Sequence, residues 1–358
     1  LNKGENYGCG YFKVTEKNGL RCSTAVGYLN QIKKNKNLKI ETNCHVQKIN
    51  FNGNTAESVT YSKDNKNFTV VAEKEIILCA GSIGSPHLLQ TSGIGEASKL
   101  KDLGIDIVKD LKGVGKNLQD HLMFRPVYKV KNIETLNKKI NSVFGKLLIG
   151  LEYVFKRKGP MTMGASQLCG FAKSDPTRDT PNLQFHIQPI STDKLGGANL
   201  HDFHAFTPTV ANIRPTSRGE ITINSSDSKV NPKIKMNYLS TDEDRKVAAD
   251  GIKLIRKIVM ETNEFKKYEP EEFRPGSHLN EKEEIVKACS HYAQTIFHPV
   301  GTCKMGNDES AVVSDKLKVH GLNKLRVIDA SIMPNITSGN TNAPTIMIAE
   351  KGADMILS

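Results

Sequence analysis

The stretch IILCAGSIGSP, residues 76–86, decides the fold class of this chain. Its first five residues are an apolar run with the length of a buried strand, and Gly81 ends that run. Ser85 suits the N-cap of a helix and Pro86 suits its first position, so we expect a helix over residues 87–91. A strand that passes through glycines into a helix is typical of nucleotide-binding α/β proteins, although the G-x-G-x-x-G fingerprint occurs nowhere in the chain.

Patterns on both sides of this unit extend the α/β prediction. Before it, residues 38–50 alternate as in a half-buried strand, and a second strand near 57–61 and a third after the turn at 63–67 complete a β-meander. Near the end of the chain, residues 325–328 read as another buried strand, followed by a helix over 343–357. The middle of the chain mixes predicted helices (131–158, 242–261, 280–293) with short strands (183–187, 220–223).

Composition narrows the classes of function. The chain has 358 residues with 38% hydrophobic side chains, enough for two domains or one large folded unit. Its net charge of +12 comes from lysines spread along the sequence without interleaved aromatics, so a solvated surface is favoured over nucleic-acid binding. Seven cysteines form no CxxC pair, which predicts no metal site and a reducing, cytoplasmic compartment.

The hydropathy and the first residues of the chain bear on membrane spans and on its relation to a longer protein. No apolar run approaches the length of about 18 residues that a membrane span needs. The first residues, LNKGENYGCG, contain neither an initiator Met nor a signal peptide, so we expect a fragment of a longer protein.

Two segments hold the candidate functional residues. His298 lies in FHPVGTCKMG, residues 297–306, where a proline and two glycines constrain the backbone. By itself this setting fits a structural loop histidine as well as a catalytic one. TSGNTNAPT, residues 337–345, precedes the last predicted helix. Its backbone N–H groups could hold an anion, or Asn342 could simply cap the helix.

Taken in order, these segments resemble the glucose–methanol–choline (GMC) oxidoreductase family. The resemblance covers almost the whole chain and is carried by several long motifs. They are HPVGTCKMG (298–306), LRVIDASIMP (325–334), SGNTNAPT (338–345), AGSIGSPHLLQTSGIG (80–95), GVGKNLQDH (113–121), RPTSRG (214–219) and NGLRCS (18–23).

The resemblance implies an FAD enzyme of α/β class with a Rossmann-like flavin domain and a substrate domain built on an antiparallel sheet. It divides the chain into a central part of the flavin domain (1–122), a substrate domain (123–295) and an active-site loop with the end of the flavin domain (296–358). It implies no metal. His298 matches the family's active-site histidine and Asn340 its partner. The matched flavin contacts are Val46 at the adenine, Asp329 and Ala330 at the pyrophosphate, and Asn342, Pro344 and Thr345 at the isoalloxazine ring.

The implied reaction is oxidation of a primary alcohol, with His298 as the base and hydride transfer to the flavin. Choline is a leading candidate substrate, but Gln167 stands where the choline-type pattern has a glutamate, so an uncharged alcohol is an equal candidate. A quinone, a carrier protein or oxygen would accept the electrons, and quinone reduction would suit a peripheral contact of the basic surface with a membrane. The alternatives are a cyanohydrin (hydroxynitrile) lyase of the same family and a non-catalytic fragment. Because the glycine-rich pyrophosphate turn is absent, we expect the isolated chain to purify colourless.

Overall fold

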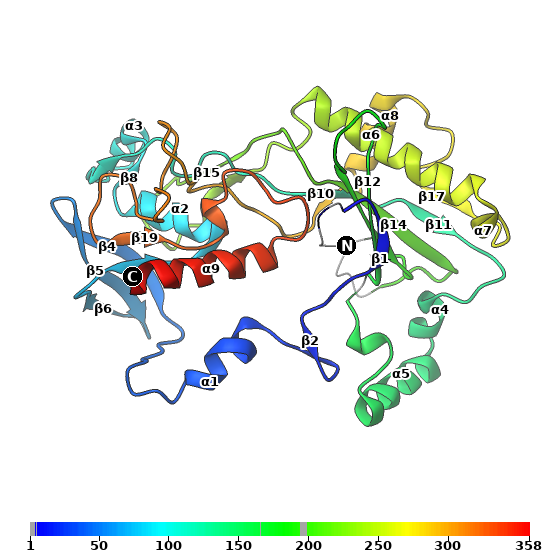
Figure 1. Cartoon of the computed structure of the whole chain (residues 1–358), viewed down its shortest axis with the longest axis horizontal. Coiled ribbons are helices and arrows are strands. Elements are labelled where there is room, and N and C mark those ends of the chain that lie inside the picture. Colours follow the sequence, from blue (N-terminus) through cyan, green and yellow to red (C-terminus); the bar gives the residue numbers. More distant parts are fainter. Residues whose placement is uncertain (1–3, 5, 165, 194–198) are drawn as a thin grey trace. The chain divides into compact units, whose positions relative to one another are not determined.

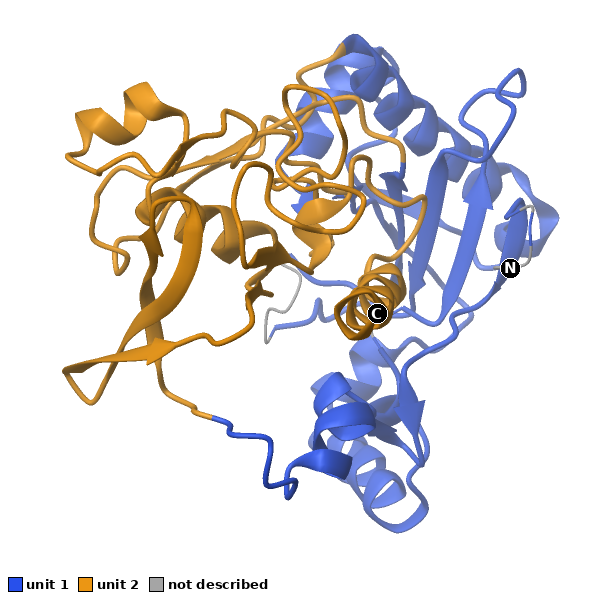
Figure 2. Cartoon of the chain, turned by 60° about the vertical axis from the view of Figure 1, so that its left-hand side comes forward, with its two compact units in different colours: residues 1–40, 122–213, 242–295 blue, residues 41–121, 214–241, 296–358 orange. Residues whose placement is uncertain are grey.

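The computed structural model describes residues 4, 6–164, 166–193 and 199–358. The chain divides into two compact units that each draw on separate parts of the sequence (Figure 2). Unit 1 contains residues 1–40, 122–213 and 242–295, and unit 2 contains residues 41–121, 214–241 and 296–358.

Unit 1 is built on an antiparallel sheet of eight strands among the described residues. The main order is β1 (Gly8–Tyr11), β12 (Leu168–Ala172), β13 (Leu183–Gln188), β14 (Ala205–Asn212), β10 (Leu122–Phe124) and β18 (Gln294–Thr295). Beside β14, β11 (Val127–Lys129) continues to β17 (Glu271–Arg274). A two-stranded ribbon of β2 (Glu16–Lys17) and β3 (Leu20–Arg21) stands apart from this sheet.

Helix α6 (Asp242–Arg256) packs against β14 because its sequence presents one apolar side. Ala248, Ile252 and Ile255, spaced as the apolar face of an amphipathic helix, are buried. Gly251 allows the close approach: a Cβ there would meet Val210 of β14 at 3.0 Å. Figure 1 shows α6 beside α8 (Lys282–Ser290). The other helices of unit 1 are α1 (Asn30–Ile32), α4 (Leu136–Asn141), α5 (Val143–Lys156) and α7 (Asn263–Lys266), with short helical turns at Ala25–Leu29, Pro160–Thr162 and Lys257–Glu261.

Unit 2 contains the stretch that decides the fold class. Strand β7 (Ile76–Leu78) pairs in parallel with β19 (Leu325–Val327), and α2 (Gly81–Thr91) follows β7. The predicted meander is present as β4 (His45–Asn52), β5 (Thr55–Lys63) and β6 (Lys66–Val71). The last helix, α9, spans Asn342–Leu357. The remaining elements are β8 (Ile94–Gly95), α3 (Ala97–Asp102), β9 (Lys109–Asp110), β15 (Glu220–Thr222), β16 (Lys233–Lys235) and a 3-10 turn at Ala330–Ile332.

Three local predictions were wrong. The first strand begins at His45, seven residues later than the alternation from residue 38 suggested. Ile77 of β7 is 41% exposed, so this strand is not fully buried. Helix α2 begins at Gly81 rather than after Ser85, because the Ser85 hydroxyl donates to the carboxylate of Asp329 at 2.5 Å instead of capping the helix.

The mixed α/β class with an antiparallel sheet is confirmed. The chain passes between the two units near residues 41, 122, 214, 242 and 296, and the predicted domain ranges stay a prediction. The assignment of a flavin or substrate role to each range stays a prediction. None of the helices in the described part of the chain has the length and apolar character needed to cross a lipid bilayer.

Candidate active site

His298 is placed by a tightly constrained loop of unit 2. Phe297 adopts a left-handed backbone (φ 65°), which turns the chain sharply before the histidine. Gly301 (φ 95°) lies so close to residue 117 that a Cβ would meet the Asn117 carbonyl at 2.5 Å, so only glycine fits. Val300 and Gln119 exchange backbone hydrogen bonds of 2.9 and 3.0 Å, which join this loop to residues 117–121.

Asp120 holds the backbone of the histidine. Its Oδ1 accepts the His298 N–H at 2.9 Å, and its Oδ2 accepts the hydroxyl of Tyr238. Asp120 and His298 are both buried, with His298 only 7% exposed. The backbone of His298 is therefore fixed, and burial leaves its imidazole little freedom to rotate.

Both ring nitrogens of His298 have a partner. Nε2 lies 3.3 Å from the amide nitrogen Nδ2 of Asn340, and Nδ1 lies 3.0 Å from Nδ1 of His121. An amide nitrogen only donates, so Nε2 of His298 must be the unprotonated nitrogen in this contact. The neutral ring then carries its proton on Nδ1, and this N–H donates a hydrogen bond to Nδ1 of His121. We call His298, Asn340, His121 and Asp120 the His298 centre.

Burial sets the charge of this histidine. Removal from water disfavours the imidazolium and lowers the pKa of His298 to about 4. At neutral pH the ring is therefore neutral, with a lone pair on Nε2 directed at Asn340. A neutral, oriented imidazole is the form that can accept a proton from a hydroxyl group.

Asp329 organises the backbone around the same loop. Its Oδ2 accepts from the N–H of Gly81 (2.9 Å) and from Ser85, and its Oδ1 accepts from the N–H of Ser331 (2.8 Å). The next residue, Ala330, is half-buried, and its carbonyl accepts the N–H of Gly301 at 3.3 Å. These contacts join the start of α2 and the end of β19 to the His298 loop. The carboxylate of Asp329 is thus engaged with the protein, which leaves backbone groups as the contacts available to a ligand.

The first turn of α9 is open. Thr341 occupies the N-cap but makes no side-chain capping hydrogen bond. The interpretation of Asn342 as the cap is wrong, since this residue lies inside the helix and is exposed. Pro344 and Thr345 are half-buried, and the Thr345 hydroxyl donates to the Thr341 carbonyl at 2.7 Å. Uncapped N–H groups and the helix dipole favour a negative charge here.

Val46 lies apart from this network. It pairs with Tyr61 within the meander, beside a shift in strand register, and its side chain is 38% exposed. None of its hydrogen bonds within the described chain joins it to the His298 centre. The structure therefore brings His298 and Asn340 together, whereas Val46 stays a predicted adenine contact.

Sequence reasoning missed the roles of His121 and Asp120. Both were visible at the end of the GVGKNLQDH motif, yet they are 177 and 178 residues from His298. The available signal was an adjacent acid and histidine at the end of a motif that begins with two glycines, but no spacing rule connects them to residue 298.

Family models of the GMC oxidoreductases match residues 1–123 and 215–349. The chain therefore belongs to the GMC oxidoreductase family, whose cofactor is FAD.

Individual relatives refine this placement. The chain is 41% identical over 360 residues to an alcohol dehydrogenase [acceptor] of Pseudomonas putida, covering 100% of this chain and 65% of that protein. It is 42% identical over 343 residues to an oxygen-dependent choline dehydrogenase of Pectobacterium carotovorum, covering 96% and 61%. The chain thus spans less than two thirds of these curated relatives.

Solved structures show the same fold. Formate oxidase of Aspergillus oryzae superposes with a TM-score of 0.91 at 27% identity, covering 99% of this chain and 66% of that one. Pyridoxine 4-oxidase superposes with a TM-score of 0.86 at 27% identity, covering 99% and 65%.

Proposed function

We propose that this chain carries the proton-accepting site of an FAD-dependent enzyme that oxidises a primary alcohol to an aldehyde. The observation that carries the proposal is the buried, neutral His298 whose Nε2 lone pair lies 3.3 Å from the amide nitrogen of Asn340. A hydroxyl group that displaces this mutual contact can give its proton to Nε2 while its oxygen accepts from the Asn340 amide.

The residues present fit a flavin at the isoalloxazine end. The uncapped, exposed first turn of α9 offers N–H groups to an anion, so Asn342, Pro344 and Thr345 would hold the ring. Backbone groups of Asp329 and Ala330 would lie along the pyrophosphate, and the backbone of the half-exposed Val46 would meet the adenine. When bound, FAD supplies a hydride acceptor at N5.

The protein's own groups handle the proton and the oxygen. Nε2 of His298 takes the hydroxyl proton as the carbinol carbon loses its hydride, which leaves an aldehyde and an imidazolium. The amide of Asn340 donates to the alkoxide-like oxygen and orients it. The Nδ1 proton stays on His298 and forms a hydrogen bond to Nδ1 of His121, so the imidazolium keeps an acceptor at Nδ1.

The substrate we propose is choline or an uncharged primary alcohol. The curated relatives named choline dehydrogenase and alcohol dehydrogenase support both choices. Their names also support different acceptors, so we propose oxygen, a quinone or a carrier protein as the oxidant of the reduced enzyme. A quinone acceptor would suit a peripheral contact of the lysine-rich surface with a membrane.

The test is anaerobic stopped-flow mixing of the full-length flavoprotein with choline and a panel of primary alcohols. We expect substrate to bleach the flavin, and His298→Gln to slow bleaching by about 10²–10⁴-fold, the usual contribution of a general base. Asn340→Ala should slow it by about 10²–10³-fold, as loss of an oxyanion donor does. The exposed His278→Gln is the matched control and should leave the rate unchanged.

Two results would refute the proposal. A cyanohydrin lyase would leave the flavin oxidised with every alcohol, and a non-catalytic protein would neither bleach nor cleave. A His298→Gln rate within a few-fold of wild type would remove the histidine from its role even if the flavin were reduced.

A further inference from the structure

Arg125 of unit 1 is a buried cation, and two of its side-chain nitrogens lack a hydrogen-bond partner among the described residues. It joins β10 to β11, and it is 5% exposed. Its neighbours Phe124 and Val127 are also buried. Within the described chain, Nε and Nη2 of Arg125 are buried and neither has a hydrogen-bond partner. Since arginine keeps its proton in proteins, this is a positive charge removed from water.

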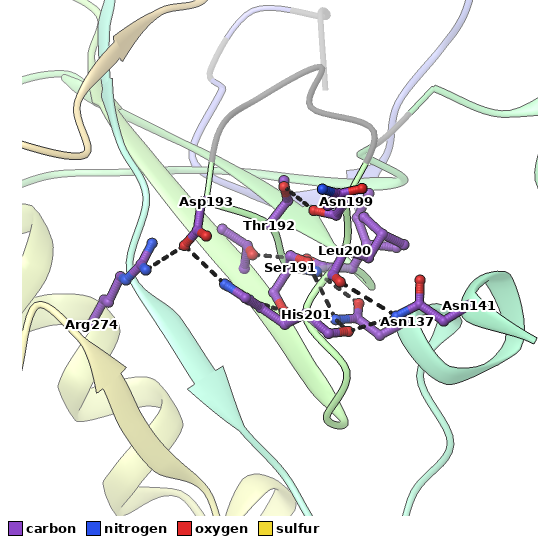
Figure 3. Close-up of polar contacts among 11 residues, drawn as sticks. Asn137, Asn141, Ser191, Thr192, Asp193, Asn199, Leu200, His201 and Arg274 are labelled. Atoms are coloured by element: carbon purple, nitrogen blue, oxygen red, sulfur yellow. Dashed lines mark hydrogen bonds and ion pairs between the residues drawn. The ribbon is translucent and has the colours of Figure 1, made fainter.

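The nearby charges do not compensate it. Burial and the like charge of Arg274 both lower the pKa of Arg125, and no carboxylate among the described residues raises it. Arg274, in β17 opposite Val127, is paired with Asp193. Figure 3 shows that Asp193 also contacts Nε2 of His201, at 3.1 Å. The carboxylate of Asp193 is therefore bound by Arg274 and His201.

A second, half-buried arginine of the same unit shows which contact Arg125 lacks. Arg256 donates from Nε to Oε2 and from Nη2 to Oε1 of Glu272, both at 2.9 Å. Nε and Nη2 form one edge of the guanidinium, and their parallel N–H bonds match the two oxygens of a carboxylate. In Arg125 this same edge is the one that lacks a partner.

We propose that Arg125 is a binding site for the carboxylate group of a small organic acid, held side-on by Nε and Nη2. A buried charge without a counter-charge is destabilising. Binding of a ligand carboxylate would offset the desolvation cost of the Arg125 guanidinium. The two parallel N–H groups of this edge match two oxygens of one anion, and the Arg256–Glu272 pair shows the same edge binding a carboxylate. This site is independent of the flavin reaction proposed above.

The test is ligand binding to the full-length protein, followed by thermal unfolding and by NMR of the arginine Nε–H groups. The probes are sodium acetate, succinate and benzoate, with phosphate as the tetrahedral anion and sodium chloride at matched ionic strength. We expect at least one carboxylate to raise the Tm and to shift the Arg125 Nε–H resonance. Arg125→Gln should weaken this carboxylate's binding by about 10–100-fold, the loss expected for charge-assisted hydrogen bonds.

Two matched variants sharpen the test. Arg125→Lys keeps the charge but loses the two-pronged edge, so its carboxylate affinity should lie between wild type and Arg125→Gln. Arg21→Gln removes an exposed arginine of β3 and should bind like wild type.

The proposal has clear ways to fail. Equal stabilisation of wild type and Arg125→Gln by the carboxylates, or stabilisation by phosphate alone, would overturn it. So would a marked fall in Tm of ligand-free Arg125→Met, because it would mean that a protein carboxylate already pairs with Arg125 in the full-length chain. An unchanged or higher Tm of Arg125→Met supports the proposal, and neither measurement depends on alcohol oxidation.

Discussion

The His298 centre of unit 2 and Arg125 of unit 1 are both buried polar groups, but their surroundings differ. Both ring nitrogens and the backbone N–H of His298 have partners. Arg125 has a buried edge with no partner among the described residues. Burial neutralises the histidine, whose pKa falls to about 4, whereas a guanidinium cannot be neutralised.

This difference separates two kinds of function. A group that can lose its charge is stable when buried and becomes a base held ready for a substrate proton. A group that must keep its charge remains costly until an anion arrives, which makes it a binding group. Three experiments test this comparison, in order of decreasing expected effect.

The largest effect is expected for Arg256, the paired counterpart of Arg125. Arg256→Met should lower the free energy of unfolding by about 3–5 kcal/mol, because it leaves the buried Glu272 without its partner. Urea titration of the protein measures this change. Arg245→Met removes an ion pair with the exposed Asp242 and should cost at most about 1 kcal/mol. If both variants lowered the free energy of unfolding by the same amount, burial would not determine how much these ion pairs stabilise the protein.

The second experiment follows the pKa of His298. In the unfolded chain a histidine binds a proton near its model value of 6.5, whereas folded His298 does so only near pH 4. The unfolded state therefore gains protons first, and stability should fall as the pH decreases from about 6.5 to 4, by about 3 kcal/mol in total. Below pH 4 this residue should cause no further fall.

Urea titrations at several pH values between 7.5 and 4 provide the measurement. His298→Gln is the control, since it lacks this titration but keeps the neighbouring Asp120 and His121. If the two proteins lose stability in parallel, the histidine is not held neutral by the fold.

The smallest effect is expected for His121. His121→Phe removes the acceptor of the Nδ1 proton and should slow flavin reduction by about tenfold, the equivalent of one hydrogen bond to a charged group. His121→Asn can place its side-chain oxygen near the position of Nδ1 and should restore most of the rate. NMR of labelled histidine in the wild type should show His298 protonated at Nδ1, and an Nε2-protonated ring would contradict the proposed orientation.

Part of this site could be predicted from the sequence because the relevant residues lie in long ordered motifs. The segments around His298 and Asn340 carry enough specific residues to predict a histidine–asparagine pair, and the two side chains are in contact. The partners of Asp329 could not be predicted in this way. Its bonds to Gly81 and Ser85 span 248 and 244 residues, and they move the start of α2 away from the position that local capping rules favour.

Composition, periodicity and motif order by themselves determined the α/β class, the meander, the buried side of α6 and the two residues that face each other at the candidate site. Only the tertiary structure decided that His121 and Asp120 complete the His298 centre and that the Nε–Nη2 edge of Arg125 is buried with no partner in the described chain. The physical reason is that periodicity and capping act over a few neighbouring residues. Desolvation and hydrogen bonding depend on what lies near in space, and for these groups that is set by segments far apart in the chain.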